Sequence, residues 1–442
     1  MTTFPARARS PLPGSTGTRA PSLSEVDFER SPFLVIWETT QACDLACVHC
    51  RAEARPERDR RELSTAEAKA LMRRVRSFGR PLFVLTGGDP AKRPDLVELV
   101  AYGAELGLRM GLTPSGTPLV TPELIAELRS VGLSRLAVSL DGPTPAQHDG
   151  FRGVDGSYDW TLGMLKAARE VGLSTQVNTT VSRRTLSDFE AMARLVDGLG
   201  ISLWSVFFLV PTGRARMEDL PSAEEVERIF ERMYELSAGV PFDIKSTAAP
   251  QYRRMILQRQ VKERKEGSRS EAPSPLTAGV GFSLSDGVGR ARGVNDGNGF
   301  LFVSHRGDVY PSGFLPLPAG NVRDQDVVRL YRDHEMFRSL RDPDRLKGKC
   351  GSCEFRSICG GSRARAWAMT GDPLESDPLC THVPTRYLKR VERGEAEEVQ
   401  TYFANRIPGW GRRAGATSRG SAQLPILPSR AVTERERIDG EC

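Results

Sequence analysis

Short apolar runs alternate with amphipathic segments along most of the chain that follows residue 32. Six apolar runs predict buried strands, and each is followed by a polar turn and by apolar positions at helical spacing. The predicted strands are residues 33–40, 82–86, 108–113, 135–141, 173–181 and 202–211. Repeated strand–helix units of about 30–40 residues predict an α/β fold with parallel strands joined by crossover helices. A flat doubly wound sheet and a partial barrel share this pattern.

Several of the predicted helices carry a start signal. Ser64, Ser187 and Ser222 each have a glutamate three positions later, the arrangement of a capping box. Thr121 precedes Pro122, which suits a first helical turn. We therefore expect helices to begin at these four positions.

The unusual residues follow the carboxyl ends of the predicted strands. A cysteine group, "GGDP", "SLDG", "NTT" and "PTGR" each come directly after a strand. Barrels and open α/β sheets both place their chemistry at this end of the strands. The sequence therefore predicts one site at one end of the sheet.

The rest of the chain differs in composition. Two short strands separated by "HRGD" predict a hairpin, and four more cysteines follow it. The flanking segments are rich in Pro, Gly, Ser and Arg and predict disorder. The expected divisions are a disordered tail over 1–31, a strand–helix region over 32–250, a linker over 251–298, a cysteine-rich domain over 299–395 and a mostly disordered tail over 396–442.

Composition and charge narrow the class of protein. The 39% apolar and 27% charged residues are ordinary for a globular protein. The net charge of +6 is accounted for by residues 253–270 and the last forty residues, so no nucleic-acid partner is predicted. No apolar run is long enough for a signal sequence or a membrane span, which predicts a cytoplasmic protein without membrane contact. In that compartment, grouped cysteines favour metal binding or redox chemistry over disulfides.

The first cysteine group has the pattern Cys43-x3-Cys47-x2-Cys50. A closed zinc site needs four protein ligands, so zinc would require His49 or a remote residue as the fourth. Three thiolates on a short loop suit a 4Fe–4S cluster better, and leave one iron without a protein ligand.

This pattern after the first strand resembles the radical SAM superfamily, and the resemblance extends over about residues 33–390. The family's fold is a partial TIM-type barrel, here (β/α)6, and its cofactors are S-adenosyl-L-methionine (SAM) and a 4Fe–4S cluster bound by three cysteines. "TGGDP" resembles the family's turn that receives the amino group of SAM, with glycines that leave room for it. The resemblance implies that SAM contacts Gly87, Gly88, Asp89, Pro90, Ser139, Arg152 and His49. It implies no protein catalytic residue, because the cofactor supplies the radical.

The second group, Cys350-x2-Cys353-x5-Cys359-x20-Cys380, has four thiols and resembles the C-terminal SPASM domain of radical SAM enzymes. The full SPASM pattern has seven cysteines, but Ser312 and Arg363 stand here at two of those positions. The resemblance therefore implies one auxiliary 4Fe–4S cluster, fully ligated and suited to electron transfer. A zinc ribbon-like site is the alternative.

Longer stretches such as "GDVYPSGFLPLPAGNVR" resemble the SPASM/twitch-type branch that contains tetrapyrrole-modifying enzymes of haem biosynthesis. The implied reaction is reductive cleavage of SAM to a 5′-deoxyadenosyl radical, which abstracts hydrogen from a haem-precursor side chain and leads to decarboxylation or a related change. Flavodoxin or ferredoxin is the implied electron donor. Two alternatives remain open: a radical SAM maturase of a ribosomal peptide or protein, and a non-enzymatic iron–sulfur redox sensor or electron carrier. Arg363 and Arg365 either meet substrate carboxylates or pair with acids such as Asp372.

Overall fold

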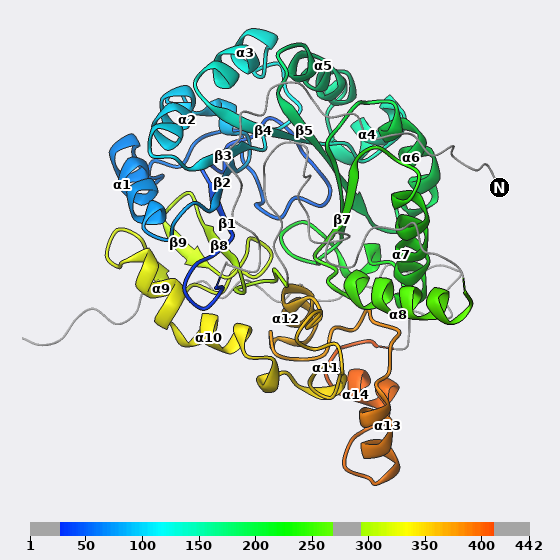
Figure 1. Cartoon of the computed structure of the whole chain (residues 1–442). Coiled ribbons are helices and arrows are strands. Elements are labelled where there is room, and N and C mark those ends of the chain that lie inside the picture. The colour runs from blue at the N-terminus through cyan, green and yellow to red at the C-terminus, as the bar shows by residue number, and fades with distance from the viewer. Residues whose placement is uncertain (1–26, 268–292, 411–442) are drawn as a thin grey trace, which may run out of the picture.

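The computed structural model describes residues 27–267 and 293–410, and its centre is one curved sheet (Figure 1). The strands run in the order β10-β9-β8-β1-β2-β3-β4-β5-β6-β7. Their bounds are β1 Leu34–Glu38, β2 Leu82–Thr86, β3 Arg109–Leu112, β4 Leu133–Ser139, β5 Ser174–Val181, β6 Leu203–Phe208, β7 Asp243–Thr247, β8 Phe300–Val303, β9 Asp308–Tyr310 and β10 Gly320–Asn321. Neighbours from β1 to β7 are parallel, so every carboxyl end faces the same way. The predicted α/β partial barrel is confirmed.

Helices cover the outer face of this sheet, as Figure 1 shows. They are α1 Thr65–Arg76, α2 Leu96–Glu105, α3 Pro122–Ser130, α4 Pro145–Arg152, α5 Ser157–Glu170, α6 Phe189–Asp197, α7 Ala223–Ser237 and α8 Gln251–Lys265. The main core lies between these helices and the sheet, and contains residues such as Leu71, Leu99 and Phe230. The inner face of the sheet surrounds the barrel interior.

The helix starts agree with three of the four capping predictions. The boxes at Ser64 and Ser222 form, and the Thr121 side chain accepts a hydrogen bond from the Leu124 amide. The prediction at Ser187 is wrong. A 3-10 turn, Leu186–Asp188, leads directly into α6, and no side chain caps that helix.

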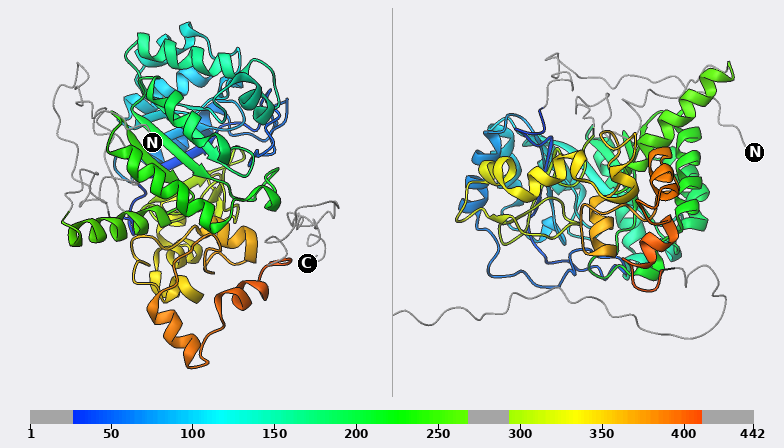
Figure 2. Two further views of the ribbon diagram at one scale, coloured as in Figure 1. Left: turned by 90° about the vertical axis from the view of Figure 1, so that its right-hand side faces the viewer. Right: turned by 90° about the horizontal axis from the view of Figure 1, so that it is seen from below.

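The C-terminal region extends the barrel sheet rather than standing apart from it. The predicted hairpin forms from β8 and β9, but β8 also pairs in parallel with β1. The remaining helices are α9 Val327–Asp333, α10 Glu335–Arg341, α11 Gly348–Gly351, α12 Arg363–Thr370, α13 Thr385–Glu392 and α14 Val399–Ala404. Figure 2 shows α11 to α14 gathered on one side of the barrel.

Two predicted boundaries differ from the structure. The segment expected to be a linker from residue 251 begins with α8, which buries Tyr252 and Ile256. The tail expected from residue 396 begins with α14, which buries Tyr402 and Phe403. Both short apolar faces lie in segments that are mostly polar, so composition did not indicate that they are buried. The rest of the predicted linker and tails, 1–26, 268–292 and 411–442, lies outside the described residues.

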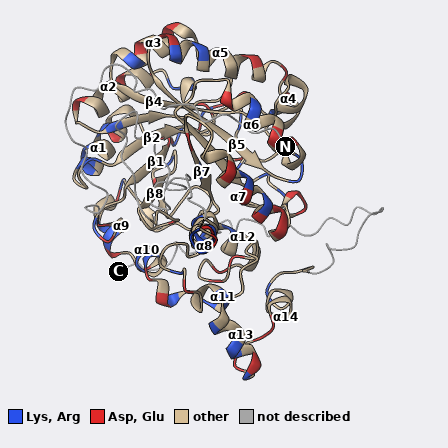
Figure 3. Ribbon diagram, turned by 45° about the vertical axis from the view of Figure 1, so that its right-hand side comes forward, with Lys and Arg blue, Asp and Glu red and all other residues tan. Residues whose placement is uncertain are grey.

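Charged residues of both signs are mixed over the outer helices (Figure 3). No helix in the described ranges combines the length and the apolar character that a membrane crossing requires.

Candidate functional site

The three cysteines of the first group lie together in the loop that follows β1. Cys43 and Cys47 are buried against Leu45, and Cys50 packs on the same cluster. The Cys43 Sγ lies 3.2 Å from the Ser115 Oγ and accepts a hydrogen bond from the Leu45 amide. Burial raises the pKa of the Cys43 thiol to about 11, so a thiolate here needs a cationic partner. This donor set fits a metal centre.

The "GGDP" turn packs directly against the backbone of the cysteine loop. The Gly88 amide donates to the Thr40 carbonyl at 2.8 Å, and the Asp89 amide donates to the Ala42 carbonyl. A Cβ on Gly88 would stand 2.3 Å from the Ala42 oxygen, and one on Gly87 would stand 2.3 Å from the Thr40 oxygen. The glycines are therefore required by the fit of two loops, in addition to the room they are predicted to leave for SAM.

Asp89 holds this turn from the inside. Its carboxylate is fully buried and accepts hydrogen bonds from the Thr117 hydroxyl at 2.7 Å and from the Ala91 amide. Burial raises the pKa of this carboxyl group. Gly87 lines the barrel cavity, whereas Asp89 and Pro90 are absent from its lining among the described residues. A direct contact of Asp89, Pro90 or Gly88 with SAM stays a prediction.

The other predicted SAM contacts converge on the cysteine loop. Arg152, the last residue of α4, pairs with Asp141 and places its Nη1 3.7 Å from the Cys47 Sγ. Ser139 ends β4 and lines the same cavity. The His49 ring stacks on Phe151 with centroids 4.4 Å apart. Burial lowers the pKa of His49 to about 4, which favours the neutral ring.

A cavity of about 400 Å³ occupies the barrel interior. One end is lined by Cys47, His49 and Cys50, and another part by the segment from Val294 to Asp296. Alternate residues of β5 point into it, as the period of a strand requires, and the apolar wall comes from β1, β2 and β8. Those residues are Gln176, Asn178 and Thr180 on β5, and Leu34, Ile36, Leu82, Val84, Phe300 and Phe302 on the apolar wall.

The four distant cysteines also come together. Cys350, Cys353, Cys359 and Cys380 all line one small cavity of about 20 Å³. Burial raises the pKa of the Cys353 thiol to about 11, so this site too suits thiolates only beside a cation. Residues of the first turns of α8, Gln251 and Arg254, line this small cavity, so α8 lies beside both sites.

The two positions that depart from the SPASM pattern have other roles here. Ser312 lines the large cavity. Arg363 is buried and donates to the carbonyls of Pro373 and Glu375. Arg365 is buried and pairs with Asp377, as the pairing alternative predicts, whereas Arg363 forms no ion pair within the described residues. Neither arginine is among the described residues that line the large cavity. Asp372, the acid named for that alternative, pairs instead with Lys347.

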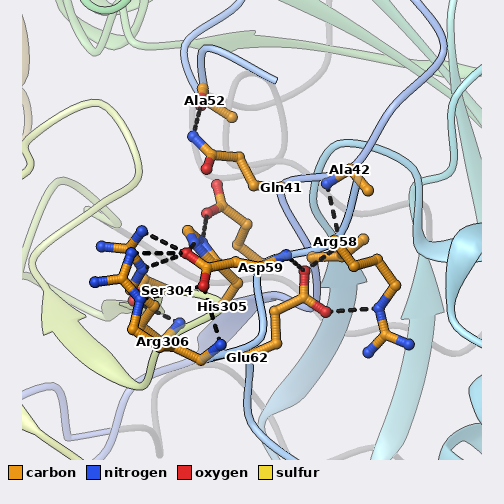
Figure 4. A network of polar contacts seen from close by, with 12 residues as sticks. Gln41, Ala42, Ala52, Arg58, Asp59, Glu62, Ser304, His305 and Arg306 are labelled. Carbon is orange, nitrogen blue, oxygen red and sulfur yellow. Dashed lines mark hydrogen bonds and ion pairs between the residues drawn. The ribbon is translucent and has the colours of Figure 1, made fainter. Parts of the chain in front are cut away.

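Sequence reasoning missed a buried polar network at the end of β1. Glu38 pairs with Arg51 at 2.9 Å and with the His305 Nδ1 at 2.7 Å. Arg51 lines the cavity and lies over the Phe302 ring, 4.7 Å from its centroid. Figure 4 shows Asp59 beside Arg306 and His305 in this network. Only the position of Arg51 next to Cys50 hinted at it, because Glu38 and His305 are 267 positions apart.

The parallel strands, the three-cysteine loop after β1 and the adjacent glycine turn define a class of iron–sulfur enzyme. The family model of the radical SAM superfamily matches residues 37–196. The "AdoMet-dependent heme synthase" of Methanosarcina barkeri is 41% identical over 355 residues, which cover 80% of this chain and 97% of that protein. This chain belongs to the radical SAM superfamily. It is an enzyme of radical chemistry, and its family uses SAM and a 4Fe–4S cluster.

Two further comparisons agree with this assignment. The "Fe-coproporphyrin III synthase" of Methanosarcina barkeri is 31% identical, over 87% of this chain and 95% of that protein. Among solved structures, SuiB of Streptococcus suis bound to S-adenosylmethionine has a TM-score of 0.59 at 16% identity, with 80% of this chain and 78% of that chain covered. At 16% identity, the similarity to SuiB concerns the fold alone.

Proposed function

We propose that this radical SAM enzyme acts on a propionate side chain of a porphyrin-type haem precursor and converts it to a vinyl group. The observation that carries the proposal is the cavity between the two cysteine groups. It joins an apolar wall, with Phe300 and Phe302, to the basic side chains of Arg135, Lys245 and Arg253. A porphyrin has the same two characters, an apolar ring and anionic carboxylates. The similarity to a haem synthase over 97% of that protein supports the same substrate class.

The chemistry follows from the difference between a propionate and a vinyl group. The change from –CH2–CH2–COO⁻ to –CH=CH2 releases CO2, one hydrogen atom and one electron. When bound, SAM and its reduced cluster supply the acceptor of that hydrogen atom. The protein's part is to orient the substrate, and to exclude water from a radical reaction inside the barrel.

The predicted SAM contacts keep their roles in this proposal. In this proposal Cys43, Cys47 and Cys50 hold the 4Fe–4S cluster, and Arg152, Ser139 and Gly87 line the cavity in which SAM would bind beside it. Arg152 offers a guanidinium for a carboxylate. His49 offers a neutral ring face.

We also propose that Cys350, Cys353, Cys359 and Cys380 hold an auxiliary 4Fe–4S cluster that takes up the released electron. A flavodoxin or ferredoxin is the proposed donor for the SAM-binding cluster. The zinc alternative predicts iron in one group only, so metal content separates the two. Reconstituted protein should contain about eight iron atoms per chain, and about four would contradict the auxiliary cluster.

Anaerobic turnover tests the substrate. The reconstituted protein is incubated with SAM, dithionite and Fe-coproporphyrin III, and 5′-deoxyadenosine, CO2 and vinyl porphyrins are measured. We expect all three products, with one CO2 for each vinyl group formed. Formation of 5′-deoxyadenosine without any change in the porphyrin would refute the substrate but leave the enzyme class intact. A chain that cleaves no SAM would contradict the whole proposal.

A further inference from the structure

The charged lining of the barrel cavity is strongly unequal in sign. Five basic residues and one acidic residue, Asp296, line it within the described ranges; the basic residues are Arg51, Arg135, Arg152, Lys245 and Arg253. Glu38 pairs with Arg51, and Asp141 pairs with Arg152. Arg135 is close enough to Lys245 to lower the pKa of the lysine to about 8, together with burial as the main cause. The basic side chains that line the cavity therefore outnumber the acidic one within the described ranges.

Arg253 differs from Arg51 and Arg152 because its hydrogen bonds go to backbone carbonyls and not to a carboxylate. It is 6% exposed and lies in the first turns of α8. Its Nη1 donates to the Ile358 carbonyl at 3.0 Å, and its Nη2 donates to the Val294 carbonyl at 2.6 Å. Both acceptors are neutral, so the contacts fix the guanidinium plane without balancing its charge.

Two of the five N–H donors of Arg253 make these hydrogen bonds, and the other three have no partner within residues 27–267 and 293–410. Its Nε is buried and makes no hydrogen bond within residues 27–267 and 293–410, and no carboxylate of those residues forms an ion pair with it. Burial lowers the pKa of Arg253 to about 10, and the charge of the nearby Cys359 sulfur opposes this shift only in part. The unmet donors of a buried guanidinium are stabilised when a further anion joins it. Because Arg253 lines the cavity, that anion would come from the cavity.

Arg253 lies beside the second cysteine group. Ile358, which holds its Nη1, directly precedes Cys359 of the second cysteine group. Asn295, which lines the cavity nearby, donates to the Gly361 carbonyl at 2.8 Å. A carboxylate bound at Arg253 thus lies in the part of the cavity that adjoins the second cysteine group.

We propose that Arg253 binds a carboxylate of the substrate and fixes the orientation of the porphyrin in the cavity. The inference rests on the proposed function and assigns a residue to it. Arg253 is a substrate-binding residue that selects for acidic side chains. Arg→Lys is not conservative here, because a lysine lacks the fork that contacts two carbonyls and a ligand together.

Binding of metal-free porphyrins tests this assignment without turnover. Coproporphyrin III, with four carboxylates, is compared with its tetra-amide, which has the same shape and no charge. Dissociation constants are measured by fluorescence anisotropy for the reconstituted wild type, Arg253→Met and Arg253→Lys. Arg259→Met is the matched control, since Arg259 lies on the same helix and pairs on the surface with Glu231 and Glu263.

We expect Arg253→Met to weaken coproporphyrin III binding about ten- to hundredfold, the usual range for a hydrogen bond to a charged group. The dissociation constant of the tetra-amide should change less than about threefold. The dissociation constant of coproporphyrin III for Arg253→Lys should lie between those of the wild type and Arg253→Met. Arg259→Met should match the wild type.

The outcomes separate this inference from the proposed function. If wild-type protein binds coproporphyrin III and Arg253→Met binds it equally well, the role of Arg253 is refuted and the substrate class stands. Equal weakening of the acid and the amide also refutes it, since only cavity shape would then have changed. If the wild type binds neither porphyrin while it still cleaves SAM, the substrate class itself fails. Should Arg253→Met not fold, Arg253→Lys carries the same comparison.

Discussion

Arg365 ties α12 to the ends of two barrel strands, so its removal should loosen the C-terminal region from the barrel. Its guanidinium pairs with Asp377 at 3.1 Å, and both side chains are 0% exposed. It also donates to the Ala248 carbonyl at 2.8 Å, the Phe208 carbonyl at 3.2 Å and the Leu209 carbonyl at 3.3 Å. Phe208 ends β6, and Ala248 follows β7.

The expected cost of Arg365→Met follows from what it leaves behind. Breaking a fully buried ion pair by removing one partner costs about 3–5 kcal/mol. Asp377 keeps hydrogen bonds from the Ser362 and Leu379 amides and from Gln251, so its charge remains partly compensated. The three barrel carbonyls lose a donor. We therefore expect a loss of about 3–5 kcal/mol in the free energy of unfolding.

Anaerobic urea unfolding of the reconstituted protein, followed by circular dichroism, measures this loss. In the double variant Arg365→Met with Asp377→Asn, the two costs should fall short of additivity by about 0.5–3 kcal/mol. Arg232→Met is the control, because Arg232 forms a surface pair with Glu190 and should cost about 0–1 kcal/mol. A loss below about 1 kcal/mol would refute the reasoning. So would weaker coproporphyrin III binding at unchanged stability, since Arg365 would then contact the substrate.

Three further changes test other parts of the structure. Gly88→Ala should destabilise the protein by about 1–3 kcal/mol and release iron from the first site, because the new Cβ would stand 2.3 Å from the Ala42 oxygen. Gly163→Ala is the control and should do neither, because Gly163 lies on α5 with open space around it. Iron content and urea unfolding measure the two effects. Cys47→Ser should abolish 5′-deoxyadenosine formation and lower iron from about eight to about four per chain; unchanged cleavage would contradict the ligand assignment. Lys245 has a pKa of about 8 in the folded state, below its unfolded value of 10.5. Between these two pH values the unfolded chain binds more protons than the folded chain, so the free energy of unfolding should rise with pH across that window. Lys245→Met should remove this rise and be more stable than the wild type at pH 7, and a persisting rise would show that another group causes it.

The sequence predicted the elements whose evidence is local. Six of the strands and two capping boxes follow from residues within a few positions of one another, and the spacing of the thiols picked out both cysteine groups. The glycine turn shows the limit of such reasoning. Room for SAM was a sufficient reason for "GGDP", yet the contacts of Gly87 and Gly88 with Thr40 and Ala42 depend on how two loops meet. The spacing of residues along the chain does not indicate which loops from different strands contact each other.

The part of the cavity wall that the sequence did not predict arises from one non-local pairing, that of β8 with β1. In its register, Leu34 is opposite Phe300 and Ile36 is opposite Phe302, and all four side chains line the cavity. The predicted domain boundary at residue 299 therefore adjoins a strand that completes the barrel wall. The same return of the chain brings Val294 to Arg253 and His305 to Glu38. Because Phe300 and Phe302 of the apolar wall and the acceptor at Val294 lie beyond residue 290, a fragment ending at residue 250 would contain the three-cysteine loop but neither Arg253 nor this part of the cavity wall.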